Sequence, residues 1–211
     1  MGCDIHMFAE YKTKPSSMTV YDSKGRHEET IEPFWMKIGK EFLNLYYDPT
    51  IPIDDYNEIH TDQPYHDRNY ILFAFLADVR NYREIKPIAM PKGLPEDVSD
   101  EIKEESDDWG SDGHSHSYFT LEELENADWN QIVSLEAHLI KKDYELFKKI
   151  NRPPNNSLEH YFEDRPYEVK WSEFIYEKCL DFLEALRPLK KRVNFNKEEY
   201  KNIRLVFWFD N

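Results

Sequence analysis

Two short clusters of carboxylate and imidazole side chains carry the chemistry that this sequence suggests. Asp4 and His6 stand near the start of the chain, and His114 and His116 stand in the segment Gly-His-Ser-His-Ser. The members of each pair are two residues apart, so in an extended segment their side chains point to the same side. Carboxylates and neutral imidazoles are common ligands of zinc, manganese and iron. We therefore predict a divalent metal ion, zinc or manganese, bound by these four residues.

Each pair also has an ordinary structural interpretation. Asp4 and His6 fit polar positions at the start of a strand, and His114 and His116 fit loop histidines that hydrogen-bond to the backbone. The glycine-rich loop around the second pair favours a functional role, because binding and catalytic residues concentrate in loops. The spacing alone leaves both interpretations open.

A second group of candidates lies around position 66. The dipeptide His66-Asp67 resembles the His-Asp pair of metal-dependent phosphohydrolases and would supply a catalytic base or a group that supports the metal ligands. Tyr65, Arg68 and Arg80 are the predicted contacts to a phosphate or another small anionic ligand. The structural alternatives are that Asp67 caps the following helix and that Arg68 pairs with nearby acids.

The two cysteines, Cys3 and Cys179, do not suggest a disulfide framework. The ordinary role of such a residue is a small buried side chain. A nucleophilic role for Cys3 would need a neighbouring base that the sequence does not supply. Asp210 and Asn211 either add ligands at a strand end or lie in solvent.

The composition argues against several classes of protein. The chain has 211 residues, of which 40% are hydrophobic, as expected for a folded domain with a substantial core. Its formal net charge of −15 would repel the phosphates of a long nucleic acid. The sequence contains neither an apolar run long enough to cross a membrane nor a secretory signal pattern, so we expect no membrane partner.

Hydrophobic periodicity predicts the elements that must position these residues. Residues 4–12 alternate as a strand, and residues 18–22 form a second strand that pairs with the first in a hairpin. Residues 68–82 are apolar on all sides and predict a buried helix. The apolar segment 203–209 predicts a strand at the centre of a sheet.

Four further helices are predicted. They cover residues 96–108, the segment that starts at the capping box of Thr120, residues 130–150, and residues 171–187.

The fold class that follows is α+β. We predict a single domain over residues 1–211 with a helical elaboration over roughly residues 120–190. Its mixed or antiparallel sheet holds the N-terminal hairpin and the C-terminal strand, and several helices pack on it.

Segments distributed along the whole chain resemble an uncharacterised family of bacteriophage and prophage proteins. They are the opening MGCDIH, then RNYILFAFLADVRN, PKGLPEDVS, DGHSHS with the following T-L-x-E-L, and the ending RLVFWFDN. The resemblance implies a phage-encoded protein in the cytoplasm of a bacterial host, where it would counteract host defence. It implies no particular reaction.

A partial resemblance concerns the calcineurin-like metallophosphoesterases. Their Asp-x-His and Gly-His-x-His motifs are similar to this chain at Asp4, His6, His114 and His116 only. The Gly-Asp and Gly-Asn-His motifs of that family are absent here, so its fold is not carried over.

The sequence therefore supports two classes of function. The first is a metal-dependent hydrolase of a nucleotide or another phosphoester, in which the ion activates water and polarises a phosphoryl oxygen. The alternative is a non-enzymatic phage protein that sequesters a nucleotide-like signal molecule or inhibits a host protein. A DNA-mimicking inhibitor is a third interpretation of the charge, and the sequence does not indicate an oligomeric state.

Overall fold

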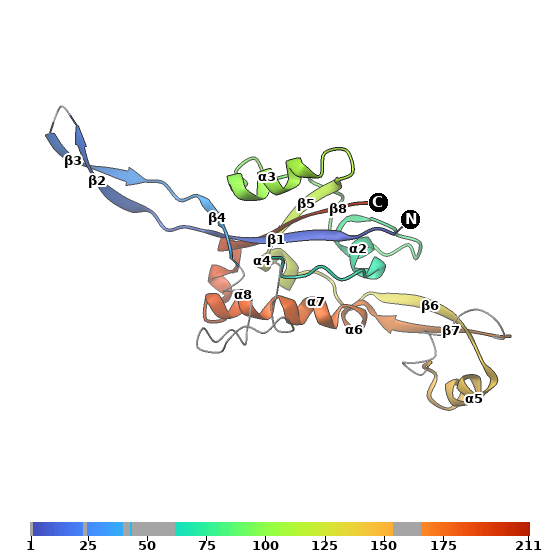
Figure 1. Cartoon of the computed structure of the whole chain (residues 1–211). Coiled ribbons are helices and arrows are strands. Elements are labelled where there is room, and N and C mark those ends of the chain that lie inside the picture. Colours follow the sequence, from blue (N-terminus) through green and yellow to red (C-terminus); the bar gives the residue numbers. More distant parts are fainter. Residues whose placement is uncertain (1, 23–24, 40–42, 44–61, 154–165) are drawn as a thin grey trace, which may run out of the picture.

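A four-stranded antiparallel sheet forms the centre of the molecule (Figure 1). The computed structural model describes residues 2–22, 25–39, 43, 62–153 and 166–211. In order across the sheet, the strands are β4 (Trp35–Lys37), β1 (Ile5–Lys12), β8 (Ile203–Phe209) and β5 (His114–Thr120). Every residue of β8 is buried. The predicted α+β class and the central C-terminal strand are both confirmed.

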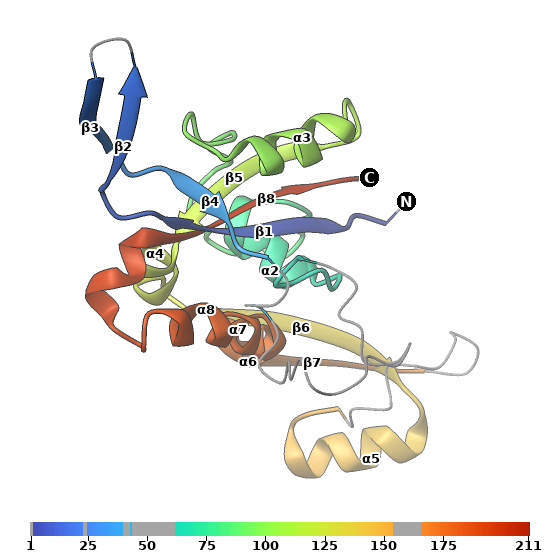
Figure 2. The same ribbon diagram turned by 60° about the vertical axis from the view of Figure 1, so that its left-hand side comes forward.

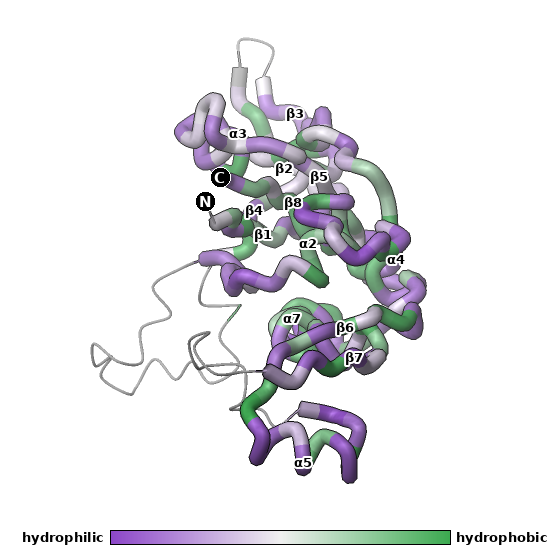
Figure 3. The backbone as a smooth tube through the Cα atoms, turned by 90° about the vertical axis from the view of Figure 1, so that its right-hand side faces the viewer, coloured by the Kyte–Doolittle hydropathy of each residue, from purple (hydrophilic) through white to green (hydrophobic). Residues whose placement is uncertain are grey.

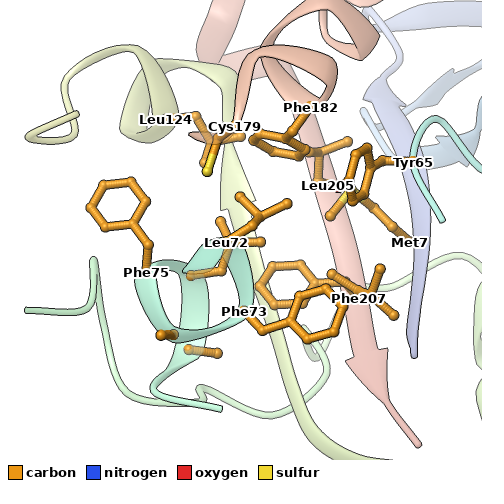
Figure 4. Close-up of a cluster of buried hydrophobic side chains, with 14 of the residues drawn as sticks. Met7, Tyr65, Leu72, Phe73, Phe75, Leu124, Cys179, Phe182, Leu205 and Phe207 are labelled. Carbon is orange, nitrogen blue, oxygen red and sulfur yellow. The ribbon is translucent and has the colours of Figure 1, made fainter. Parts of the chain in front are cut away.

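The two faces of the sheet are covered by different helices (Figure 2). Alternate residues of β8 point to opposite faces. On one face Phe207 and Phe209 belong to the large core that includes Phe73 of α2 (Tyr70–Ala77), as Figure 4 shows for Phe73 and Phe207. On the other face Trp208 packs in a smaller core with Ile102 of α3 (Asp100–Asp108).

Two-stranded ribbons and short helices complete the described structure. β2 (Ser16–Asp22) and β3 (Gly25–Ile31) form a ribbon that extends away from the central sheet (Figure 1). β6 (Ile132–Leu139) and β7 (Tyr167–Phe174) form another ribbon. The remaining elements are α4 (Leu121–Glu125), α5 (Lys141–Ile150), α6 (Ile175–Lys178), α7 (Leu180–Ala185), α8 (Arg187–Arg192) and the 3-10 helix η2 (Lys197–Asn202).

Figure 3 shows polar residues along α3 and α5 and apolar residues at α2 and α7. The exposed acidic helix expected within residues 96–108 is confirmed as α3, and the capping box at Thr120 opens α4. None of the helices in the described part of the chain has the length and apolar character needed to span a bilayer.

Two of the predicted helices are partly strands. Residues 130–150 contain β6 before α5, and residues 171–187 begin in β7 and continue in α6 and α7. Buried and exposed residues alternate along both strands, which is the period of a half-buried strand. The helical prediction over 171–187 was wrong at its start because Trp171 also fits a helical spacing with the apolar residues that follow it.

The N-terminal hairpin is shifted by one strand relative to the prediction. β2 pairs with β3, whereas β1 pairs with β8 from Ile5↔Phe209 to Tyr11↔Ile203. The expected pairing of residues 4–12 with 18–22 is therefore wrong. Most of β1 is buried, so it needs a partner inside the core, and the apolar β8 provides one.

A buried ion pair joins the two central strands. Arg204 Nε on β8 donates to Glu10 Oε2 on β1 at 2.6 Å, and both side chains are almost fully buried. The other carboxylate oxygen of Glu10 accepts the backbone N–H of Ser99 at 2.7 Å. Arg204 also donates to Asp97 Oδ1 at 2.6 Å and lies over the ring of Trp35. Through Asp97 and Ser99, the pair therefore connects the loop before α3 to the two central strands.

Replacing Arg204 with methionine should strongly destabilise the fold, because it leaves the Glu10 carboxylate buried without its partner. We expect the free energy of unfolding to fall by about 3–5 kcal/mol in urea titrations followed by tryptophan fluorescence. The matched control is Lys148→Met, which removes the exposed ion pair with Glu145. Its expected effect is small, and equal losses in the two variants would contradict the role assigned to the buried pair.

Candidate functional site

The helix predicted over residues 68–82 is present as α2, but it is shorter at both ends. Asn69 caps its start, because the Asn69 Oδ1 accepts the backbone N–H groups of Ile71 and Leu72, both at 3.1 Å. Asp78 ends it in a left-handed conformation. The capping role considered for Asp67 therefore belongs to Asn69, and Asp67 is exposed.

The turn after α2 has a strained backbone. Asp78, Arg80 and Glu84 have φ angles of 59°, 53° and 54°, a region that residues other than glycine rarely adopt. The Asn81 side chain holds the turn by bonding both the N–H and the carbonyl oxygen of Ile85, at 2.9 and 2.8 Å. Strained turns of this kind are common at functional sites, where the surrounding structure compensates for their cost.

A pocket of about 520 Å³, here called the α2 pocket, opens beside this helix. Its described lining comes from α2 itself, from the segments before and after this helix, from β6, and from α6 and α7. Four basic side chains line it, and they are Arg68, Arg80, Arg83 and Lys178. The described acidic residues of the lining are Asp67 and Asp181, and three tyrosines also contribute, Tyr65, Tyr70 and Tyr82. Among the described lining residues basic groups outnumber acidic ones four to two, although the whole chain carries a net charge of −15. Two of the basic groups have acidic partners outside the lining, because Arg68 pairs with Asp4 and Lys178 lies 3.3 Å from Glu173. The volume is typical of a small-molecule site.

The structure brings together the three residues that the sequence assigned to an anionic ligand. Tyr65, Arg68 and Arg80 all line the α2 pocket, and so does Asp67. His66 is exposed and is not among the lining residues. Burial, followed by the charge of Asp67, raises the pKa of Tyr65 well above its usual value, so this hydroxyl stays protonated.

Residues from both ends of the chain hold the pocket arginines. Arg68 Nε and Nη2 donate to the two carboxylate oxygens of Asp4, both at 2.7 Å, and this pairing holds the pKa of Asp4 below its usual range. The guanidinium of Arg68 also lies so close to Gly2 that a side chain there would collide with it. Arg80 Nη2 donates to Asn211 Oδ1 at 3.0 Å. Pairing of Arg68 with an acid was the structural alternative considered for this residue.

A second cluster of titratable groups lies at the same end of the sheet. His6 Nε2 is 3.3 Å from Asp210 Oδ2, and Asp210 Oδ1 accepts the backbone N–H of Asp4 at 2.9 Å. The His6 ring packs on Trp109 with a centroid distance of 3.9 Å and lies 5.9 Å from the ring of Trp208. Asp210 therefore links the imidazole on β1 to the segment that binds Arg68.

The two histidines of β5 are separated by a β-bulge. Ser115 adopts a left-handed φ of 54°, and the strand register shifts after His114. His114 packs beside Phe209 with a centroid distance of 6.1 Å, whereas His116 packs beside Trp208 at 5.6 Å. Because neighbouring residues of β8 point to opposite faces, the bulge removes the same-side arrangement that the spacing predicted for these histidines.

Each β5 histidine has one polar contact to a serine. His116 Nε2 lies 2.9 Å from Ser106 Oγ, and His114 Nδ1 lies 3.0 Å from Ser115 Oγ. Burial, reinforced by His114, lowers the pKa of His116 and favours its neutral form. Two buried nitrogens, His114 Nε2 and Trp208 Nε1, have no hydrogen-bond partner among the described residues.

The predicted metal ligands do not meet at one point in this arrangement. Within the described part of the chain, no group of three or more histidine, cysteine, aspartate or glutamate side chains is arranged to hold a metal ion. Asp4 pairs with Arg68, and His116 bonds to Ser106. A zinc or manganese site built from Asp4, His6, His114 and His116 therefore stays a prediction, and it would require these side chains to change partners.

Both cysteines are free and buried, in agreement with the ordinary role considered for them. Burial raises the pKa of Cys179 to about 12 and also raises that of Cys3. Neither thiol therefore ionises near neutral pH, and Cys3 is a poor nucleophile in this environment.

Several residues of the two clusters were missed by the sequence analysis. Trp109 was interpreted only as part of a loop, although an aromatic residue close to a histidine pair was an available signal. Arg83 lies only three residues after Arg80, and this closeness to a predicted ligand contact was a signal that could have identified it. Nothing in the sequence pointed to Lys178, because it enters the α2 pocket from a distant helix.

Compared with models of protein families, with curated proteins and with solved structures, the chain matches none.

The bulge in β5 should make the side chain at position 115 unusually sensitive to substitution. Ser115→Val places a β-branched residue at a positive φ, so we expect the free energy of unfolding to fall by about 1–3 kcal/mol. Ser115→Gly tolerates this backbone and should change stability much less. The control is Ser134→Val in β6, an exposed strand residue without this backbone strain. Urea titration measures all three, and a loss in Ser134→Val as large as in Ser115→Val would contradict the prediction.

His116 should make the protein less stable in mild acid. Its pKa is lowered in the folded state, so the unfolded chain takes up the proton first as the pH falls. The stabilisation is present above the unfolded pKa of about 6.5 and is lost as the pH drops through the folded value.

The measurement is the free energy of unfolding at about pH 7 and about pH 5. His116→Gln should show a smaller decrease than the unchanged protein, whereas His138→Gln, on the exposed side of β6, should show the same decrease. If the free energy of unfolding of His116→Gln falls between the two pH values as much as that of the unchanged protein, other groups cause the loss of stability in acid.

Proposed function

We propose that the protein binds a small anionic ligand of nucleotide size in the α2 pocket. The observation that carries this proposal is the set of four basic side chains around a volume of about 520 Å³ in a strongly acidic chain. Nearby cations dominate the local potential even when the net charge is negative. Arginine is well suited to phosphate, because its planar guanidinium donates two parallel hydrogen bonds.

The basic groups are positioned before a ligand arrives. Asn81 fixes the strained turn that carries Arg80 and Arg83, and Arg83 Nη1 donates to the carbonyl oxygen of Ser134 at 2.6 Å. Groups that are held in place lose less conformational entropy on binding. The Arg68 side chain is half exposed, and Asp4 uses only part of its N–H donors, so a phosphate in the pocket can bind there.

Tyrosines in the lining favour a ligand with a planar group next to its phosphate. Tyr82 is 74% exposed, and its hydroxyl accepts a hydrogen bond from Arg80 Nη1 at 3.2 Å. An exposed aromatic ring offers a stacking surface to a nucleobase. A nucleotide therefore satisfies both the charge and the aromatic character of the α2 pocket better than an inorganic anion does.

A second candidate function is metal-dependent hydrolysis of such a nucleotide or phosphoester. It is favoured by the contact of His6 with Asp210, because a metal-ligating imidazole is commonly oriented by a carboxylate. In this proposal Asp4, His6, His114 and His116 hold zinc or manganese, and His66 or Asp67 assists in proton transfer.

Without turnover, the same pocket would sequester its ligand. That role agrees with the phage resemblance of the sequence, since removal of a nucleotide-like host signal requires tight binding and no chemistry. Whether the protein converts its ligand into products therefore distinguishes hydrolysis from sequestration.

Binding is tested by isothermal titration with inorganic phosphate, AMP, ADP and 3′,5′-cyclic AMP. We expect at least AMP to bind, and Arg68→Ala to weaken it by about tenfold or more, because a charge-assisted hydrogen bond is lost. The control is Arg187→Ala on α8, an exposed arginine paired with Glu184 outside the α2 pocket. A panel in which no compound binds, or an equal effect of both variants, would contradict the proposal.

The same panel, incubated with manganese or zinc and analysed for products, tests the hydrolase candidate. Turnover that disappears in a His114→Ala/His116→Ala variant supports hydrolysis by the predicted metal set. Tight binding without products, unaffected by a chelator, supports sequestration.

A further inference from the structure

We infer that His6 and Asp210 form a seat for a divalent cation, and that Asp4 completes this seat when an anion displaces it from Arg68. The inference rests on the proposed binding of an anion at Arg68. It differs from the metal set predicted from the sequence, because Asp210 takes the place of both histidines of β5. The α2 pocket and the cation seat would then act as one site for a phosphate compound with its metal ion.

The distance between the two ligand atoms would allow them to share a cation. His6 Nε2 and Asp210 Oδ2 are 3.3 Å apart. A strong charge-assisted hydrogen bond is shorter, about 2.7–2.9 Å. Two ligands at about 2.0–2.2 Å from one ion, in tetrahedral or octahedral geometry, lie about 3.0–3.5 Å from each other. The observed separation is that of a long direct hydrogen bond, and it also falls within the range expected for two ligands of one metal.

The backbone fixes both donors. β1 and β8 pair at Ile5↔Phe209, directly beside them. Beyond this pair, the N–H of Asp210 donates to the carbonyl oxygen of Asp4 at 3.2 Å, and the N–H of Asp4 donates to Asp210 Oδ1 at 2.9 Å. Only Oδ2 of Asp210 then faces His6. Trp109 packs on the imidazole and limits its rotation. Metal sites depend on such orientation of their ligands by surrounding groups.

Asp4 is a neighbouring carboxylate that could supply a third ligand. It precedes His6 by two residues in an extended segment, so its side chain can turn to the side of the imidazole. After the dominant effect of Arg68, the charge of His6 also lowers the pKa of Asp4, as expected for neighbouring groups. Both oxygens of Asp4 are bonded to Arg68 in this structure, which leaves the cation seat with two ligands.

The ion pair of Asp4 with Arg68 is open to competition. The two side chains are 44% and 50% exposed, and exposed pairs are weak in water. A phosphate that enters the α2 pocket brings more negative charge to Arg68 than Asp4 does. The released carboxylate then joins His6 and Asp210, and a cation bound there attracts the phosphate in turn. Such coupling is reciprocal, so each ligand strengthens the binding of the other by the same factor.

The test measures manganese affinity by electron paramagnetic resonance of the free ion, with and without saturating AMP. Parallel titrations without protein correct for the manganese–AMP complex. We expect AMP to tighten manganese binding by about tenfold. Asp210→Asn should weaken manganese binding by about tenfold or more, since it replaces a carboxylate ligand. This variant keeps an acceptor for the N–H of Asp4, and circular dichroism confirms its fold. His6→Gln is the second variant and should have the same effect.

Asp4→Asn separates the coupling from simple electrostatics. Without metal it should bind AMP more tightly than the unchanged protein, because the competing carboxylate is gone. AMP should then tighten manganese binding much less than it does in the unchanged protein, because the third ligand is also gone and only the direct attraction between phosphate and cation remains. The control is Glu184→Gln, which removes an exposed acid on α7 outside the α2 pocket and should leave the coupling intact.

The possible failures are distinguishable. AMP binding that leaves manganese affinity unchanged would overturn the coupled cation seat and leave the proposed function standing. An absence of AMP binding, with or without manganese, would overturn both. Manganese binding that survives Asp210→Asn but is lost in His114→Ala/His116→Ala would overturn the seat described here in favour of the set predicted from the sequence.

Discussion

The structure depends on the insertion of β8 between β1 and β5. β8 is buried along its whole length, with one face against α2 and the other against α3. Pairing on both edges satisfies its backbone groups, and the burial of its aromatic side chains supplies the main apolar surface that both cores share. The Arg204–Glu10 pair is the polar exception, and its burial is tolerated because each group is fully bonded.

The same pairing assembles both clusters of candidate residues. β1 begins where β8 ends, so Asp4 and His6 meet Asp210 without any contribution from a loop. α2 packs on this end of the sheet, with Arg68 just before the helix and Arg80 just after it. Asp4 bonds to Arg68, and Asn211 bonds to Arg80. The position of the α2 pocket is therefore a consequence of strand order.

The sequence predicted the parts of this arrangement that depend on local pattern. The apolar run 203–209, the capping box at Thr120 and the buried helix after Asn69 each have a local signature, and each is present. The pairing of the strands was harder to predict. β1 pairs with β8 and not with β2, and this choice depends on contacts between segments that are distant in the sequence. β6 and the second half of β7 were taken for helices because a short apolar pattern fits both periods.

The candidate site shows the same division. Residue types identified Tyr65, Arg68 and Arg80, which share one pocket, whereas the two-residue spacing of His114 and His116 failed to predict their orientation. The reason is the bulge at Ser115, since one left-handed residue reverses the side on which the next side chain lies. Such a bulge has no signature when the residue is not glycine.

The antiparallel register of Ile5 with Phe209 also bears on how the chain folds during synthesis. β1 leaves the ribosome before the other described strands, and its partner β8 leaves after them. Contacts so distant in sequence close slowly, because a long loop must be ordered before they form. An apolar strand would therefore wait without its partner while the residues between the two strands are synthesised, exposed to chaperones and to wrong pairing. The candidate site at this end of the sheet would form only after β8 has emerged.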